Sequence, residues 1–256
     1  KEIARAQAKA GRFAEAFSTA RQIADADKRA EALREIARAQ ARAGRFAEAF
    51  STARQIEDAD ERALAFGWIA LAQADAGLFA DAFSTKRQIE KEFGEADVLL
   101  WGIASAQAKA GQFGDAISTA RQTSWQAFAL RDIASVQAEA GRFADAVATA
   151  RQIEGAGLRA AALRAIALAQ AKASRVEDAR LTFADALSTA WQIEEASLCA
   201  LALEGIASDQ ARAGQVEQAL ALAEEIRKVA GQAAYVNALV AIAKALIGEE
   251  DTPDEE

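Results

Sequence analysis

The sequence contains no histidine, no methionine, one cysteine (Cys199) and one proline (Pro253). One cysteine cannot form an internal disulfide, and without histidine the chain lacks the usual ligand sets of zinc, haem and iron–sulfur sites. Ser-His-Asp and Cys-His catalytic machinery is excluded as well. Cys199 lies in an apolar run, which favours a small buried side chain over a reactive thiol. A lone cysteine is typical of a reducing compartment, so we expect a cytoplasmic protein.

Proline and aromatic residues are scarce, whereas alanine fills 72 of the 256 positions. This composition argues against a sheet protein, which needs more β-branched, aromatic and turn residues. No apolar run reaches the ~18 residues typical of a membrane span, and no signal peptide opens the chain. We therefore expect a soluble helical protein. Since the sequence also lacks an initiator methionine, we expect it to be part of a longer protein.

The sequence repeats itself at intervals of 30 to 40 residues. Seven hexapeptides follow the pattern AQAxAG or a close variant, among them Ala6–Gly11, Ala39–Gly44 and Ala72–Gly77. A second block follows each of them, and Arg12–Ile23 is identical to Arg45–Ile56. An isoleucine three residues before each hexapeptide, and an eighth near the end, mark the register: Ile3, Ile36, Ile69, Ile103, Ile133, Ile166, Ile206 and Ile242.

Each repeat reads as two helices, which we call the A helix and the B helix. The apolar spacing predicts an A helix over Lys28–Ala43 and a B helix over Arg45–Ile56. Gly44 between them suits the left-handed conformation that ends many helices. Asp27 and Asp60 are expected to cap the N-termini of A helices. Such a pair cannot bury its apolar face alone, so stacked pairs are expected, with about fifteen helices and no strand.

The repeat resembles the tetratricopeptide repeat, a helix–turn–helix module of 34 residues. Ala37 matches the small residue of its first helix, Phe46 the aromatic that opens its second helix, and Ala49 the alanine that follows. The resemblance covers residues 1–247 and implies an all-α, right-handed α-solenoid of about 7.5 repeats. It also implies a concave face, lined by A helices, that recognises peptides or protein segments. Gln40 replaces the expected aromatic, and the closing proline is missing.

A second resemblance leaves an alternative open. The phrase AKAGRFAEA, residues 8–16, is similar to pentatricopeptide repeats, which bind single-stranded RNA. Base readout needs a repeated polar pair at fixed positions, whereas here those positions vary, and aromatic stacking platforms are few. Nucleic acid is therefore the less favoured partner.

Two stretches depart from the regular repeat. About seven extra residues near Arg175–Leu181 precede an otherwise normal B helix, and Ser174 replaces the glycine there. They predict either a lengthened surface helix or a local protrusion that serves as an interface. A shortened connection contains Trp125, which we expect to pack against the tight turn. After one domain over 1–247, the tail 248–256 holds six acids and no base, so we expect it to be disordered.

The concave positions that the resemblance implies carry mostly basic side chains. Twelve are basic and four acidic, although the whole chain has a net charge of −8. This predicts a basic groove that favours acidic peptides; the alternative is that these charges serve only solubility. The basic residues are Lys1, Arg5, Lys9, Arg34, Arg38, Arg42, Lys109, Arg131, Arg164, Lys172, Arg212 and Lys244, and the acids are Glu31, Asp75, Glu139 and Glu204.

The middle of the same face carries an apolar strip beside Trp68. It consists of Leu64, Leu71, Val98, Trp101 and Phe128. These residues either contact a partner or pack against neighbouring A helices. The repeated glutamines, Gln40 and Gln73 among them, replace a buried aromatic and predict a structural hydrogen-bond ladder.

The sequence therefore predicts a non-catalytic scaffold that binds a protein segment, with no cofactor and no metal. No clustered carboxylate pair, phosphate loop or metal motif indicates an enzyme. The first repeat lacks most of its A helix, so Ile3 and Phe13 are expected to have no N-terminal neighbour. That end is expected to fray or to self-associate.

Overall fold

A computed structural model describes residues 1–248, which contain fourteen α-helices and no β-strand. The acidic tail that the sequence predicts to be disordered lies, apart from Gly248, outside the described residues. The chain divides into two compact units, Lys1–Trp125 (unit 1) and Gln126–Glu256 (unit 2). Each unit consists of adjacent helix pairs, in which an A helix packs on the B helix that follows it.

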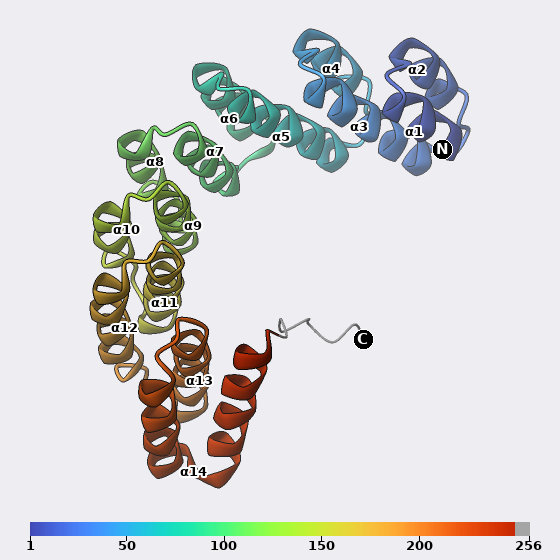
Figure 1. Ribbon diagram of the computed structural model, residues 1–256. Coiled ribbons are helices and arrows are strands. Elements are labelled where there is room, and N and C mark those ends of the chain that lie inside the picture. Colours follow the sequence, from blue (N-terminus) through green and yellow to red (C-terminus); the bar gives the residue numbers. More distant parts are fainter. Residues whose placement is uncertain (249–256) are drawn as a thin grey trace. The chain divides into compact units, whose positions relative to one another are not determined.

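In unit 1 the A helices and the B helices form two layers (Figure 1). Each A helix also contacts the next A helix, so the A layer is continuous. The A helices are α1 (Glu2–Lys9), α3 (Ala26–Arg42), α5 (Ala59–Asp75) and α7 (Val98–Lys109). The B helices are α2 (Phe13–Arg21), α4 (Phe46–Ala53), α6 (Phe79–Phe93) and α8 (Phe113–Ala120).

Unit 2 repeats this arrangement. Its A helices are α9 (Gln126–Glu139), α11 (Ala156–Lys172) and α13 (Ala196–Arg212), and its B helices are α10 (Phe143–Ala150) and α12 (Val176–Ala190). The last helix, α14 (Val216–Ile247), is interrupted at Gly231, where φ is 86° and ψ is −172°. Its two halves correspond to a B helix and a final A helix. The described residues thus contain fifteen helical segments, as the repeat count predicts.

By length and composition alone, α14 is apolar enough to cross a membrane. The non-helical backbone at Gly231 divides it into segments of which each is shorter than the ~20 residues that a span requires. The first segment buries Ala219, Leu222 and Ile226 within unit 2.

The glycine between the two helices of a pair ends the A helix, as predicted. Gly44 has φ +74°; its N–H donates to Ala41 O, and the N–H of Arg45 donates to Gln40 O. These two bonds define the Schellman motif, which satisfies carbonyl groups at the helix end. Ser174 makes the same bonds at φ 61°, the one positive φ of a non-glycine residue between 1 and 248.

The predicted N-caps are wrong by two residues. The side chains of Asp25 and Asp58, not of Asp27 and Asp60, accept the capping hydrogen bonds, from the N–H groups of Lys28 and Glu61. Each site reads Asp-Ala-Asp, and the helix begins one residue after the first aspartate. The second aspartate then lies in the first turn, where its negative charge interacts favourably with the helix dipole.

The register isoleucines form the centre of the core. From Ile36 to Ile242 they are at most 3% exposed, whereas Ile3 is 68% exposed. Among residues 1–248, none covers Ile3 on its N-terminal side, as predicted. Phe13 is nevertheless buried, because the following repeat covers it: the guanidinium of Arg45 lies 5.0 Å from its ring centroid.

The glutamine ladder forms only in part. Gln7 and Gln73 accept hydrogen bonds of 2.8 Å from Thr19 and Thr85, each within one helix pair. In five further repeats the glutamine Oε1 is buried without a hydrogen-bond partner among the described residues: Gln40, Gln107, Gln137, Gln170 and Gln210.

The two irregular stretches have structural explanations. The extra residues near Arg175–Leu181 lengthen α12 to 15 residues, against 8 in α4, α8 and α10. Trp125 packs on Trp101 with ring centroids 6.2 Å apart. The carboxylate of Asp97 fixes the same turn, because it accepts hydrogen bonds from the backbone N–H (2.8 Å) and hydroxyl (2.5 Å) of Ser124.

Candidate binding grooves on the A helices

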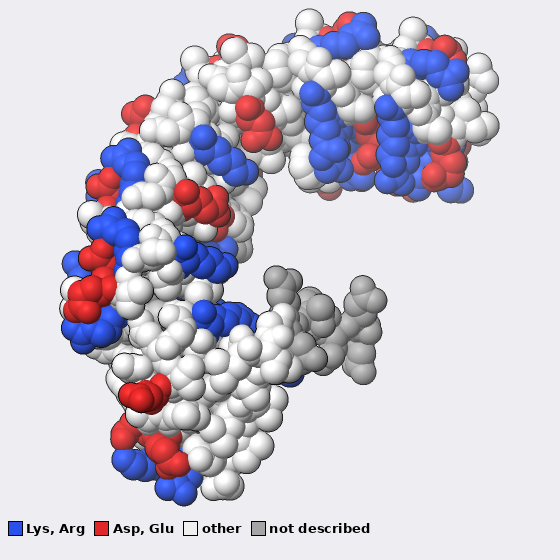
Figure 2. All heavy atoms as spheres, in the orientation of Figure 1, with Lys and Arg blue, Asp and Glu red and all other residues white. Residues whose placement is uncertain are grey.

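The A layer of unit 1 presents two neighbouring grooves. The first, of about 400 Å³, lies between α1 and α3 and is lined by Arg5, Lys9, Arg38 and Arg42. The second, of about 230 Å³, extends from α3 across α5 to α7. Arg38 and Arg42 line both, and Lys109 completes the second. Figure 2 shows lysine and arginine side chains gathered along the α1 and α3 side of this unit.

Helical spacing explains why these cations converge. Arg5 and Lys9 are four residues apart on α1, and Arg38 and Arg42 are four apart on α3, so each pair lies on one face of its helix. Arg5, Lys9, Arg42 and Lys109 make no ion pair within 4.0 Å with any residue between 1 and 248. Their charges therefore remain available to a ligand.

Other cations of the predicted groove are already paired. Arg34 Nη1 lies 3.0 Å from Glu61 Oε2, and Lys1 Nζ lies 2.8 Å from Glu31 Oε1. Arg34 therefore cannot bind a ligand carboxylate together with Arg38 unless its ion pair with Glu61 breaks. Sequence reasoning missed Glu61 because it lies in the first turn of α5, outside the positions that the repeat register assigns to the groove.

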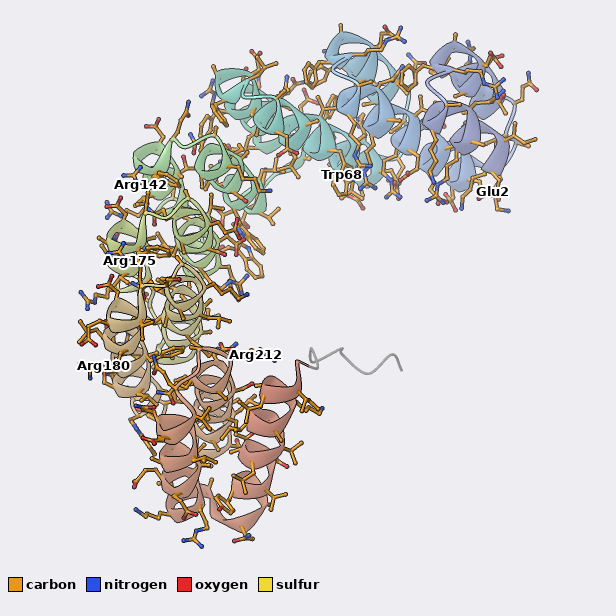
Figure 3. The ribbon with its side chains drawn as sticks, in the orientation of Figure 1. Glu2, Trp68, Arg142, Arg175, Arg180 and Arg212 are labelled. Carbon is orange, nitrogen blue, oxygen red and sulfur yellow. The ribbon has the colours of Figure 1, made fainter. Side chains whose placement is uncertain are left out.

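Arg38 lies between an acid and an aromatic ring. Its guanidinium carbon is 3.9 Å from the ring centroid of Trp68, and its Nη1 is 3.9 Å from Glu35 Oε1. Trp68, labelled in Figure 3, is 37% exposed and faces the second groove. Sequence reasoning placed Trp68 beside the strip but missed both contacts of Arg38.

The apolar strip of unit 1 divides into packed and exposed residues. Leu64 and Val98 are 51% and 54% exposed. Leu71 packs against α7, where a Cβ on Gly102 would lie 2.3 Å from Leu71 Cδ2. Trp101 is half-buried against Trp125. The strip is therefore partly a contact between A helices and partly open surface.

Phe128, Arg131 and Arg164 belong to unit 2. The guanidinium of Arg131 lies 5.5 Å from the Phe128 ring centroid and pairs with Asp132 at 3.0 Å. Arg164 bridges α11 to α13, since its Nη1 donates to Gly205 O and lies 3.1 Å from Asp209 Oδ2. The carboxylate of Asp209 is also 3.2 Å from Arg212. The side chain of Arg164 thus ties two A helices together.

Two further observations concern reactive groups. Cys199 is 5% exposed, and burial raises the pKa of its thiol, in agreement with a small core side chain. Among residues 1–248, no group of three or more histidine, cysteine, aspartate or glutamate side chains is placed to hold a metal ion. The two grooves of unit 1 thus combine several cationic groups and one stacked indole with two acids, Glu35 and Asp75. Because the cations outnumber the acids, this set favours anions and acidic side chains.

In comparisons with known proteins, no family model matches the chain and no curated protein is significantly similar to it.

Proposed function

We propose that the chain is a tetratricopeptide-like α-solenoid that acts as a non-catalytic scaffold for a protein segment. The paired helices, the intervals of mostly 33 or 34 residues and the Schellman glycines support the architecture. The continuous A layer of each unit supports a recognition face, because in helical repeats one layer forms the extended binding surface. A cytoplasmic location is part of this proposal, supported by the lone buried cysteine.

The preferred ligand in this proposal is an acidic protein segment bound along the A layer of unit 1. The observation that carries it is the convergence of Arg5, Lys9, Arg42 and Lys109, none of which has an ion pair within the described residues. Cations left unpaired on adjoining grooves attract carboxylates, and fixed positions on helices give selectivity. Arg38 on Trp68 adds a flat, partly exposed surface for an aromatic or aliphatic side chain.

A titration with three fluorescent ligands tests this proposal. These are a short oligoglutamate peptide, the matched oligoglutamine peptide and single-stranded oligouridylate. Only the oligoglutamate is expected to bind with an affinity that depends on the basic residues of the grooves. Replacing Arg5, Lys9 and Arg42 together by glutamine should weaken it about tenfold, since each exposed charge contributes about 0.5 kcal/mol.

The matched control replaces the exposed Arg21, Arg54 and Arg87, which lie on the B side of unit 1. Both triple variants change the net charge equally, so equal loss of binding would contradict a groove site. Tighter, groove-dependent binding of oligouridylate, with a steep salt dependence, would favour the RNA alternative.

A further inference from the structure

A further groove lies in unit 2, and its chemistry differs from that of the two grooves in unit 1. It has a volume of about 570 Å³ and runs between α11 and α13 to Ala241 of α14. Small residues, among them Gly157, Ala160 and Ala161 of α11 and Gly205 of α13, form much of its lining. Because these side chains are short, two packed A helices leave room between them for side chains of a ligand.

Large aliphatic side chains stand exposed at this groove. Leu198 is 51% exposed and Leu201 is 64% exposed, and both line it. Val240, next to Ala241, is 48% exposed. Leucine is mostly buried in folded proteins, and clustered exposed aliphatic residues mark interaction surfaces. The groove therefore offers an apolar contact surface that nothing between residues 1 and 248 covers.

One acidic side chain at the groove is left without a partner. Arg164 and Arg212 both pair with Asp209, which is only 3% exposed, so these three side chains together carry a net charge of +1. Glu204 also lines the groove, but it has no ion pair or hydrogen bond with the described residues. Burial raises the pKa of its carboxyl group, and no neighbouring cation offsets this. A carboxylate that is partly desolvated and unpaired is complementary to a cation.

We propose that this groove binds an amphipathic helix that packs aliphatic side chains on Leu198 and Leu201 and places a lysine or arginine against Glu204. Leu198, Leu201, Gly205 and Ser208 follow each other at intervals of three or four residues along α13. These intervals form a ridge of the kind that packs against the ridges of another helix. The inference is independent of the acidic ligand of unit 1, because it uses different helices and the opposite charge. Figure 3 labels Arg212, which lies at the C-terminal end of α13, while Leu198 lies near its beginning.

The test uses a fluorescein-labelled helical peptide of about 15 residues, or four turns, built from leucine and lysine. A matched peptide carries glutamate at every lysine position. Fluorescence anisotropy should show binding of the leucine–lysine peptide and at least tenfold weaker binding of the leucine–glutamate peptide. Glu204→Gln should weaken the first about fivefold, as expected for a partly exposed ion pair. Leu201→Ser should weaken it at least as much.

Two control variants match these changes. Glu217→Gln alters net charge in the same way at an exposed site on α14, and Leu220→Ser removes a leucine of 45% exposure outside the groove. Neither should change the affinity. Circular dichroism melting checks that Glu204→Gln and Leu201→Ser remain folded. Equal effects of Glu204→Gln and Glu217→Gln, equal affinity for both peptides, or no binding of the lysine peptide would each overturn the proposal.

Discussion

At the residue scale, substitutions at the left-handed positions that end the A helices should change stability in opposite directions at Gly44 and Ser174. Gly44 has φ +74°, and a Cβ at this position would meet no other atom within 4 Å. Gly44→Ala therefore adds only backbone strain and should destabilise the fold by about 1 kcal/mol. Ser174 already has that strain at φ 61°, so Ser174→Gly should raise the free energy of unfolding by up to about 1 kcal/mol. Urea denaturation followed by circular dichroism measures both. The same sign for the two changes would contradict the left-handed helix ends.

Asp209 and Arg164 predict an asymmetric response to mutation. Asp209 occupies a position that is alanine or valine in the other hexapeptides, and it is buried with two arginines. Arg164→Met should destabilise by about 2–4 kcal/mol, because it takes a counter-ion from a buried carboxylate. Asp209→Ala should cost less, since Arg164 and Arg212 reach solvent with side chains 35% and 31% exposed. If the two substitutions lowered the free energy of unfolding equally in thermal or urea melts, the buried carboxylate of Asp209 would not depend on Arg164 as predicted.

At the element scale, the beginning of α7 is sensitive to acid. Hydrogen bonds from Ser124 and Thr123 hold the pKa of Asp97 below its usual value. A lowered pKa in the folded state stabilises the fold above the unfolded value of about 3.9, and this contribution is lost as pH falls through the folded pKa. Tryptophan fluorescence, which reports the Trp101–Trp125 stack, should therefore change as the pH falls below about 4. Asp97→Asn should show a smaller change in that range than the parent protein.

The contact between α5 and α7 depends on a glycine without unusual backbone angles. Alanine at Gly102 would meet Leu71 Cδ2 at 2.3 Å, whereas alanine at Gly114 in α8 would meet nothing within 4 Å. Gly114→Ala should stabilise by about 0.5–1 kcal/mol through helix propensity, and Gly102→Ala should instead destabilise by about 1–3 kcal/mol through overpacking. In a Leu71→Ala background, Gly102→Ala should become neutral or stabilising. A double-mutant cycle measures this coupling.

The sequence predicts the helix pairs well because three local signals recur together: the isoleucine register, the glycine and the aromatic that opens each B helix. It does not decide between Asp25 and Asp27 as the cap, since both satisfy the same local rule. The candidate groove was predicted only as a set of positions. Whether Arg34 is open or paired depends on Glu61 of the following A helix, and that proximity arises from the packing of α3 on α5.

At the scale of the whole molecule, protection against hydrogen exchange should be uneven. α1 has 8 residues and packs on α2 and α3, and its Ile3 is exposed to solvent. Helices with few buried apolar contacts open locally at low free energy. Amide exchange in α1 and α2 should therefore be faster than in α5, which packs on α3, α4, α6 and α7. Equal protection of these helices in a dilute monomer would contradict this.

The unequal lengths of the B helices show that a B helix can lengthen without loss of the contacts between the neighbouring A helices. α12 gains its seven residues at its beginning and α6 extends past the usual end of a B helix, yet the A helices on either side keep their contacts. Within each unit, successive pairs contact each other through the A layer, so a B helix can lengthen by two helical turns, roughly 10 Å. Insertions that preserve helical phase on this side would give new surface to one pair while leaving the spacing of its neighbours intact. The same scaffold can in this way acquire additional binding elements during evolution, and a designer could graft a heptad-length epitope there.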